Sequence, residues 1–155
     1  MNTKGKSNQI VILFIMVIVV ALAIFLFFTL FKSSERNAID TVRTFYEYEK
    51  NGSFAESWEM FHPFMKEKFD KGHYLQDRAH VFMNHFEVTT FAYSLEDAEK
   101  VTNWEMEENS EVIYEAYKVP VLQEYKGKYG NFTIIQDVYA TEVEGEWVIL
   151  WDYRK

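Results

Sequence analysis

Four histidines in the middle of the sequence invite a metal-binding interpretation: His62, His73, His80 and His85. On a helix, the five positions between His80 and His85 would turn their side chains about 140° apart. His73 and His80 would share a face but lie about 10 Å apart along the axis. Neither pair can hold one ion without help from another element, so we expect surface or capping histidines, no metal site and no cofactor.

Asp77, His80 and Asn84 recur at helical spacing and would lie on one helix face. A carboxylate that orients an imidazole can serve as a general acid–base pair, which makes Asp77 and His80 candidate catalytic residues. The competing interpretation is a solvated helix face with local hydrogen bonds. We favour this second interpretation, because polar residues at helical spacing are common on exposed helix faces.

Asp137 is a third candidate base. It follows the apolar pair Ile134 and Ile135, and strand alternation would place it on one face with Ile135 and Tyr139. In an apolar pocket a carboxylate beside tyrosine donors can abstract a proton. An edge or outward-facing carboxylate is the simpler interpretation, and it is the one we favour.

Aromatic residues are abundant and could form a ligand-stacking box from Phe54, Trp58, Trp147 and Trp151. Aromatic residues at helix and strand spacing more often fill a core, which is our expectation here. Pro120 interrupts an apolar strand pattern and predicts a bulge or an edge strand. An exposed edge can accept a partner strand, so this position is the sequence's best indication of protein binding.

Charge and cysteine content narrow the partners. All 24 acidic residues but only 14 of the 16 basic residues lie beyond residue 31, so that part of the chain has a formal charge of about −10. Such a domain should repel polyanions, so nucleic acid, anionic headgroups and anionic wall polymers are disfavoured. The absence of cysteine excludes disulfides, thiolate metal sites and thiol nucleophiles.

Residues 10–31 form an apolar run that would reach about 33 Å as a helix, enough to span the hydrocarbon core. We expect a transmembrane signal anchor that contacts membrane lipid, after a cytoplasmic head at 1–9 that contains two lysines. A cleavable signal peptide is the rival interpretation, although the run is long for a signal core. The rest of the chain, 34–155, would then be one extracytoplasmic domain at the cell membrane.

The sequence of that domain predicts helices followed by strands. Helical periodicity covers 34–50, a short segment after a Ser53–Glu56 capping box, and about 74–85, and Pro63 can begin a further turn. Strand patterns cover the segments 87–93, 98–106, 111–123, 131–143 and 146–153. We therefore predict an α+β fold, with about three helices packed on a curved antiparallel meander of 4–5 strands.

The element order and the ending from Glu146 to Tyr153, with Trp147, Ile149, Trp151 and Asp152, resemble the nuclear-transport-factor-2-like (cystatin-like cone) superfamily. The ending resembles that of the small N-terminal extracytoplasmic domain of methicillin-resistance-type penicillin-binding proteins of Gram-positive bacteria. The sequence ends at Lys155 without a Ser-x-x-Lys motif in the domain, so we expect no transpeptidase. This superfamily has mixed functions, and the resemblance implies a fold more than an activity.

The function expected from these patterns is a non-catalytic binding or assembly module of a Gram-positive cell envelope, with an envelope or membrane protein as partner. The alternative is a small-molecule binder, or an isomerase- or dehydratase-like enzyme that holds a small ligand in the cone cavity and uses Asp137 or the Asp77/His80 pair as base. Regulation of a neighbouring membrane enzyme through helix contacts ranks last, because the apolar run lacks glycine and serine.

Overall fold

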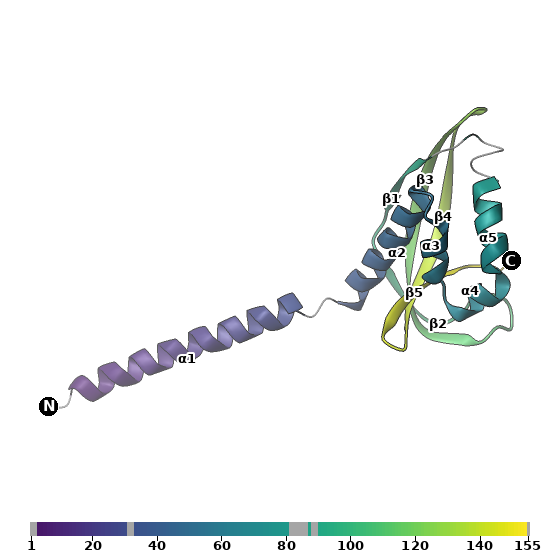
Figure 1. Ribbon diagram of the computed structural model, residues 1–155. Helices are drawn as coiled ribbons and strands as arrows, with labels where there is room; N and C mark the ends of the chain where they lie inside the picture. The colour runs from purple at the N-terminus through teal and green to yellow at the C-terminus, as the bar shows by residue number, and fades with distance from the viewer. Residues whose placement is uncertain (1–2, 31–32, 81–86, 88–89, 155) are drawn as a thin grey trace. The chain divides into compact units, whose positions relative to one another are not determined.

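The computed structural model describes residues 3–30, 33–80, 87 and 90–154 (Figure 1). The chain divides into two compact units, residues 1–33 and 34–155. The first unit contains a single helix, α1 (Thr3–Leu30). In the described chain, no helix combines the length and the apolar character required to cross a membrane. The transmembrane span expected over 10–31 therefore stays a prediction.

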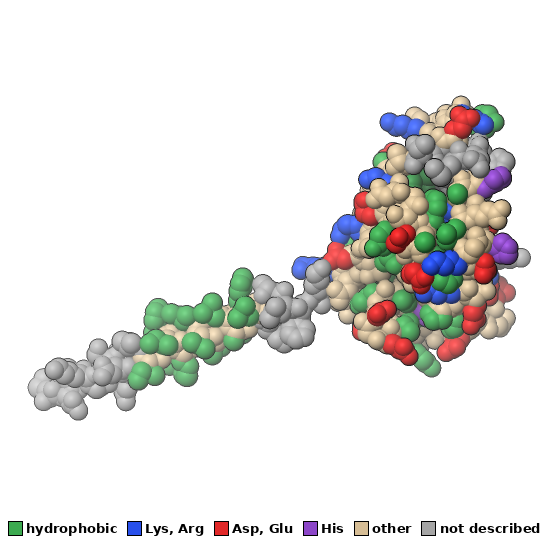
Figure 2. Space-filling model, in the orientation of Figure 1, with side chains coloured by type: hydrophobic (Ala, Val, Ile, Leu, Met, Phe, Trp, Pro, Cys, Tyr) green, Lys and Arg blue, Asp and Glu red, His purple; other side chains and the backbone are tan. Residues whose placement is uncertain are grey.

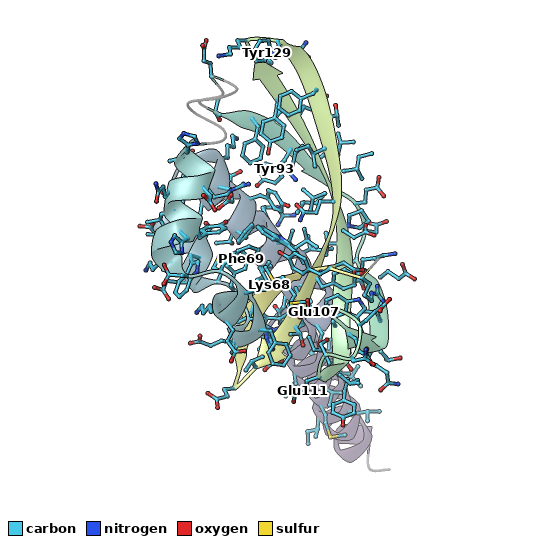
Figure 3. All side chains as sticks on the ribbon, turned by 90° about the vertical axis from the view of Figure 1, so that its right-hand side faces the viewer. Lys68, Phe69, Tyr93, Glu107, Glu111 and Tyr129 are labelled. Carbon is cyan, nitrogen blue, oxygen red and sulfur yellow. The ribbon has the colours of Figure 1, made fainter. Side chains whose placement is uncertain are left out.

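The second unit is an α+β domain, as predicted. Its helices are α2 (Ser34–Lys50), α3 (Phe54–Glu59), α4 (Pro63–Lys68) and α5 (Lys71–Arg78). Helix α2 matches the predicted 34–50 and buries Val42, Phe45 and Tyr46, which lie on one face at helical spacing. Figures 1 and 3 show the helices of this domain together on one side of the sheet.

The observed helix ends can be compared with the capping residues that the sequence predicts. Asp70 caps α5 by accepting hydrogen bonds from the backbone N–H groups of Gly72 and His73, so the helix begins before the predicted residue 74. The last part of the predicted helix 74–85 lies outside the described residues. In the described structure the Ser53 side chain makes no capping hydrogen bond, so the predicted capping box is wrong. Pro63 begins α4, as predicted.

Five antiparallel strands follow: β1 (Phe91–Leu95), β2 (Glu99–Glu105), β3 (Val112–Gly127), β4 (Gly130–Val143) and β5 (Glu146–Trp151). They confirm the predicted strand segments, except that the segment 87–93 lies partly outside the described residues. The predicted simple meander is wrong at its start. β1 and β2 both pair with the same side of β3, β2 along 112–118 and β1 along 121–125. The 16 residues of β3 are long enough to hold both short strands end to end.

Pro120 lies where β3 changes partner from β2 to β1. Its carbonyl accepts a hydrogen bond from the Glu96 N–H at 3.0 Å. The N–H and C=O groups of one strand residue point to the same side, so the donor that proline lacks would face the junction between the two short strands. The other side of β3 pairs with β4, which places Pro120 opposite Asp137 in a central strand. The predicted edge at Pro120 is therefore wrong.

A two-residue turn, Glu144 and Gly145, joins β4 to β5, and both residues have positive φ (53° and 87°). This conformation suits a hairpin turn whose twist matches that of the strands, and glycine adopts it without strain. The free side of β5 is held by the segment between α3 and α4. The Ile149 N–H donates to the Met60 carbonyl at 2.8 Å, and the His62 N–H donates to the Ile149 carbonyl at 2.9 Å.

The core lies between the helices and the sheet and is rich in aromatic side chains. Phe61, 1% exposed, is at its centre. Its ring centroid lies 5.0 Å from that of Trp151, 5.2 Å from that of Tyr74 and 5.3 Å from that of Phe45. The four residues considered as a stacking box all pack against this core, as predicted: Phe54, Trp58, Trp147 and Trp151.

Candidate functional site

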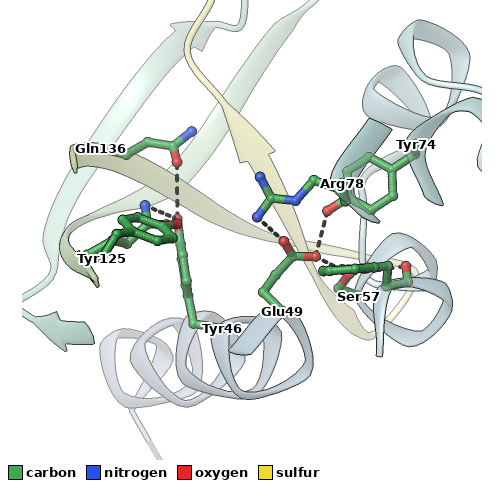
Figure 4. Close-up of polar contacts among 9 residues, drawn as sticks. Tyr46, Glu49, Ser57, Tyr74, Arg78, Tyr125 and Gln136 are labelled. Atoms are coloured by element: carbon green, nitrogen blue, oxygen red, sulfur yellow. Dashed lines mark hydrogen bonds and ion pairs between the residues drawn. The ribbon is translucent and has the colours of Figure 1, made fainter. Parts of the chain in front are cut away.

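A buried carboxylate forms the centre of the most elaborate polar cluster in the described domain (Figure 4). Glu49, at the end of α2, is 3% exposed. Its Oε1 accepts hydrogen bonds from the Tyr74 hydroxyl, at 2.7 Å, and from the Ser57 hydroxyl. Its Oε2 accepts a hydrogen bond from Nη2 of Arg78 and forms an ion pair with it. We call Glu49, Ser57, Tyr74 and Arg78 the carboxylate cluster.

Three helices supply these groups. Glu49 occupies the next position of the apolar stripe of α2, after Val42, Phe45 and Tyr46, so the helix turns its carboxylate inward. Ser57 interrupts the apolar stripe of α3 in the same manner. Tyr74 and Arg78 are four residues apart on α5 and face the same side.

Our sequence analysis did not single out the carboxylate cluster. The available signal was a charged or polar residue at a helix position where the apolar period calls for an apolar residue. Glu49 follows Val42 by seven residues on α2, and Ser57 follows Phe54 by three residues on α3. A buried charge without a partner is costly, so such a position predicts a partner elsewhere in the fold. Because Arg78 lies 29 residues away from Glu49, local periodicity could not identify it.

A second group of polar side chains lies between α2 and the sheet. The Tyr46 hydroxyl donates to Oε1 of Gln136 at 3.1 Å and accepts from Nε2 of Gln123 at 3.4 Å. The Tyr125 hydroxyl donates to Oε1 of Gln123 at 2.6 Å. Tyr46, Gln123 and Tyr125 are each at most 3% exposed, so these hydrogen bonds fix the buried surface of α2 against β3 and β4.

The phenols of the two groups are held in their neutral form. Burial raises the pKa of Tyr46 and of Tyr74 far above that of a free tyrosine; for both groups Arg78 opposes this effect and the Glu49 carboxylate adds to it. Burial also raises the pKa of Tyr125, to about 12, against the lowering effect of Arg78. At physiological pH these groups therefore donate hydrogen bonds and do not exchange protons.

The carboxylate cluster is suited to holding the negative charge of Glu49 inside the domain. Both oxygens of Glu49 are occupied by protein donors, and one donor is a permanent cation, so neither oxygen is open to a substrate. The hollows in the described surface are lined by other residues. One lies beside Trp147, between Thr141 and Gly145, and another beside Phe64, between Lys68 and Glu111. The carboxylate cluster is therefore a candidate for holding α2, α3 and α5 together. The hollows lie on exposed surface that other residues form.

The candidate catalytic residues predicted from the sequence lie elsewhere. Asp77 and His80 are both exposed, on and just after α5. Asn84, the third member of that face, lies outside the described residues. Asp137 is exposed on β4. None of the described three belongs to the carboxylate cluster, and their catalytic roles stay predictions.

The histidines occupy separate environments. His62 is buried and caps α4, its Nδ1 accepting a hydrogen bond from the Phe64 N–H at 3.1 Å. His73 has a side chain that is 83% exposed, His80 is also exposed, and His85 lies outside the described residues. Among the described residues, no three histidine, aspartate or glutamate side chains gather as metal ligands would.

His62 gives the domain a specific dependence on pH. Burial lowers the pKa of its imidazole below the unfolded value near 6.5. The unfolded chain therefore takes up this proton first as the pH falls, and the neutral folded form loses stability below about pH 6.5. We expect the urea midpoint to fall between pH 7.5 and 5 by more in the natural chain than in His62→Asn, whose amide can still cap α4. The control is the same substitution at an exposed position, His73→Asn. A fall of the urea midpoint in His62→Asn equal to that of the natural chain would contradict the assignment.

No protein-family model matches this chain, and no curated protein sequence matches it either.

Proposed function

We propose that this chain is a membrane-anchored, extracytoplasmic binding or assembly module of a Gram-positive cell envelope, without catalytic activity of its own. The observation that carries the proposal is the apolar surface of α1. In the part of α1 whose side chains are described, residues 12–26, the large apolar side chains are 43–66% exposed (Figure 2). A continuous apolar surface of this kind requires a membrane or a protein partner.

The sequence around this segment favours the membrane. A spanning helix needs about 20 apolar residues, more than the described side chains of α1 provide. The apolar sequence continues on both sides, from Ile10 to Phe31, without an ionisable residue. The backbone of α1 is helical over 28 residues, a length of about 42 Å. A helix that is apolar all round and has no charged face is typical of a membrane anchor.

The character of the domain favours binding over catalysis. The buried carboxylate of Glu49 has protein donors on both oxygens, whereas a general base needs a free oxygen that can reach substrate. The candidates Asp77, His80 and Asp137 are all exposed and lack the apolar enclosure that is typical of a catalytic acid or base. The enzyme alternative predicted from the sequence thus has less support than the binding module.

Membership of the cone-type superfamily is part of this proposal. The order of elements supports it, with helices first and then antiparallel strands that end in Trp147 to Trp151. So does the packing of Trp151 into the core beneath the helices. The resemblance to the small domain of penicillin-binding proteins supplies the Gram-positive envelope as the setting.

Topology can be tested with single cysteines, because the natural chain has none. We expect the chain to stay with the membrane after alkaline carbonate extraction. In intact cells a membrane-impermeant maleimide should label Tyr129→Cys, a position that is 83% exposed in the domain, and should label Ser7→Cys only after lysis. Release of the chain by carbonate would contradict the anchor, and labelling of Ser7→Cys in intact cells would contradict the orientation.

The partner can be sought by affinity capture from detergent-solubilised membranes. We expect a second protein to be recovered with the full chain, and its recovery to fall as salt is raised if the acidic surface contributes to binding. Recovery of this chain alone would contradict a role in binding another envelope protein.

A further inference from the structure

Within the described part of the chain, one half of β4 has no neighbouring strand on its outer side. β5 pairs with β4 only along 138–143, while β3 pairs with β4 along 130–140. Residues 131–137 therefore form an edge between the end of β5 and the hairpin tip at Tyr129 (Figures 1 and 3). We call residues 131–137 the β4 edge.

The hydrogen-bond pattern shows which groups this edge presents. Pro120 turns its carbonyl away from β4 to accept from Glu96, so Pro120 and its partner Asp137 form a pair without hydrogen bonds between them. The alternation then directs the N–H and C=O groups of the odd-numbered residues 131, 133, 135 and 137 outward. Among the described residues, no further backbone hydrogen bond outside the strand pairs takes up the outward groups of residues 131, 133 and 135, whereas Asp137 lies beside the end of β5.

The β4 edge lacks the protection that natural edges usually carry. Ile134 is 38% and Ile135 72% exposed, although neighbours in a strand point to opposite faces, so apolar surface is open on both sides of the edge. From residue 131 to 136 the segment contains no charge, proline or glycine. The outer strand β2 differs, with Glu99, Lys100 and a positive φ of 53° at Asn103. Uncharged, β-branched edges of this kind are prone to pair with another strand.

We infer that the β4 edge pairs antiparallel with the same edge of a second copy of this chain, about a two-fold axis at Ile134. The free window is centred on this residue. In that register Ile134 faces its own copy, Ile135 faces Thr133 of the second copy, and Asp137 faces Asn131. Apolar and β-branched residues meet on both faces, and no two like charges are opposed.

This contact is small, and it rests on the anchoring part of the proposed function. A single pair of short strands buries less surface than a stable dimer in solution requires. Copies confined to one membrane meet at a much higher effective concentration, which allows a weak pairing to form. The formal charge of the domain opposes the approach of two copies, so pairing should strengthen as salt screens that charge.

Disulfide cross-linking of the full chain in native membranes tests the pairing. A residue on the two-fold axis places its two Cα atoms within disulfide reach, so Ile134→Cys should form a covalent dimer on mild oxidation. The matched control is Tyr129→Cys on the same hairpin, which is more exposed. Its two copies would lie about 34 Å apart in this register, so we expect about tenfold less dimer.

Two further changes separate pairing from random collision. Thr133→Pro removes an outward N–H group without loss of a bond to β3, and should reduce the Ile134→Cys dimer to the control level. Ile135→Lys should also reduce the dimer, because a lysine on an edge strand discourages pairing, and it serves if proline disturbs the strand. Equal cross-linking of Ile134→Cys and Tyr129→Cys, or a dimer that survives both changes, would overturn the inference. Carbonate extraction of the same membranes tests the anchor separately, so a failure of the anchor is distinguished from a failure of the pairing.

Discussion

Arg78→Ala is expected to lower the free energy of unfolding of the domain by about 3–5 kcal/mol. Arg78 forms the ion pair that compensates the buried carboxylate of Glu49, whose side chain is fully buried, while 20% of the Arg78 side chain is exposed. Removal of the arginine leaves a negative charge in the interior, where the donors that remain among the described residues are the Ser57 and Tyr74 hydroxyls. Unfolding of the full chain in detergent, followed by tryptophan fluorescence, measures the loss, because all four tryptophans lie in the domain.

The matched control is Arg43→Ala, which breaks an ion pair with Asp40 on the surface of α2. The two side chains of that pair are 53% and 36% exposed, so its loss should cost less than about 1 kcal/mol. A double change, Glu49→Leu with Arg78→Met, removes both charges and should recover part of the stability lost in Arg78→Ala. Equal effects of Arg78→Ala and Arg43→Ala would show that the carboxylate cluster does not hold the domain together.

Phe61→Ala is the second large effect, with an expected loss of about 3–5 kcal/mol. Phe61 is 1% exposed and contacts aromatic rings from α2, α5 and β5, so its removal opens a cavity that several elements border. The backbone around it also holds the free side of β5 through Met60, His62 and Ile149. Denaturant unfolding with the same fluorescence signal gives the change in free energy.

Two variants calibrate the Phe61 result. Phe61→Leu keeps most of the apolar volume and should cost clearly less than alanine. Tyr129→Ala removes an aromatic side chain that is 83% exposed and should change stability by less than about 0.5 kcal/mol. A loss for Phe61→Ala no larger than that for Tyr129→Ala would mean that the aromatic contacts do not form the core.

Local sequence patterns placed the elements of the domain well. Helix α2 and the turn at Glu144 and Gly145 follow from signals within a few residues, namely an apolar stripe and a residue that tolerates positive φ. The beginning of α5 was misplaced because the capping side chain of Asp70 was overlooked. The capping box at Ser53 failed for the opposite reason, since a matching motif does not oblige the side chain to form the hydrogen bond.

The sequence and the structure indicate different residues as the candidate site. Sequence reasoning selected Asp77, His80 and Asp137 because their residue types suit proton transfer, and all three are exposed. It passed over Glu49, because its partner Arg78 is distant in the chain. The type of a residue shows what chemistry it can perform, whereas burial and partners decide whether it performs it.

By itself, the sequence determined the α+β class, the helical and strand segments, the acidic charge of the domain and the apolar run at 10–31, since composition and short-range periodicity specify these properties. The tertiary structure alone decided that β3 is central at Pro120, that Glu49 meets Arg78, and that the open edge lies on β4. Each of these depends on which distant segments meet. Contacts between distant segments are set by packing of the whole domain, and they cannot be predicted from any short window of neighbouring residues.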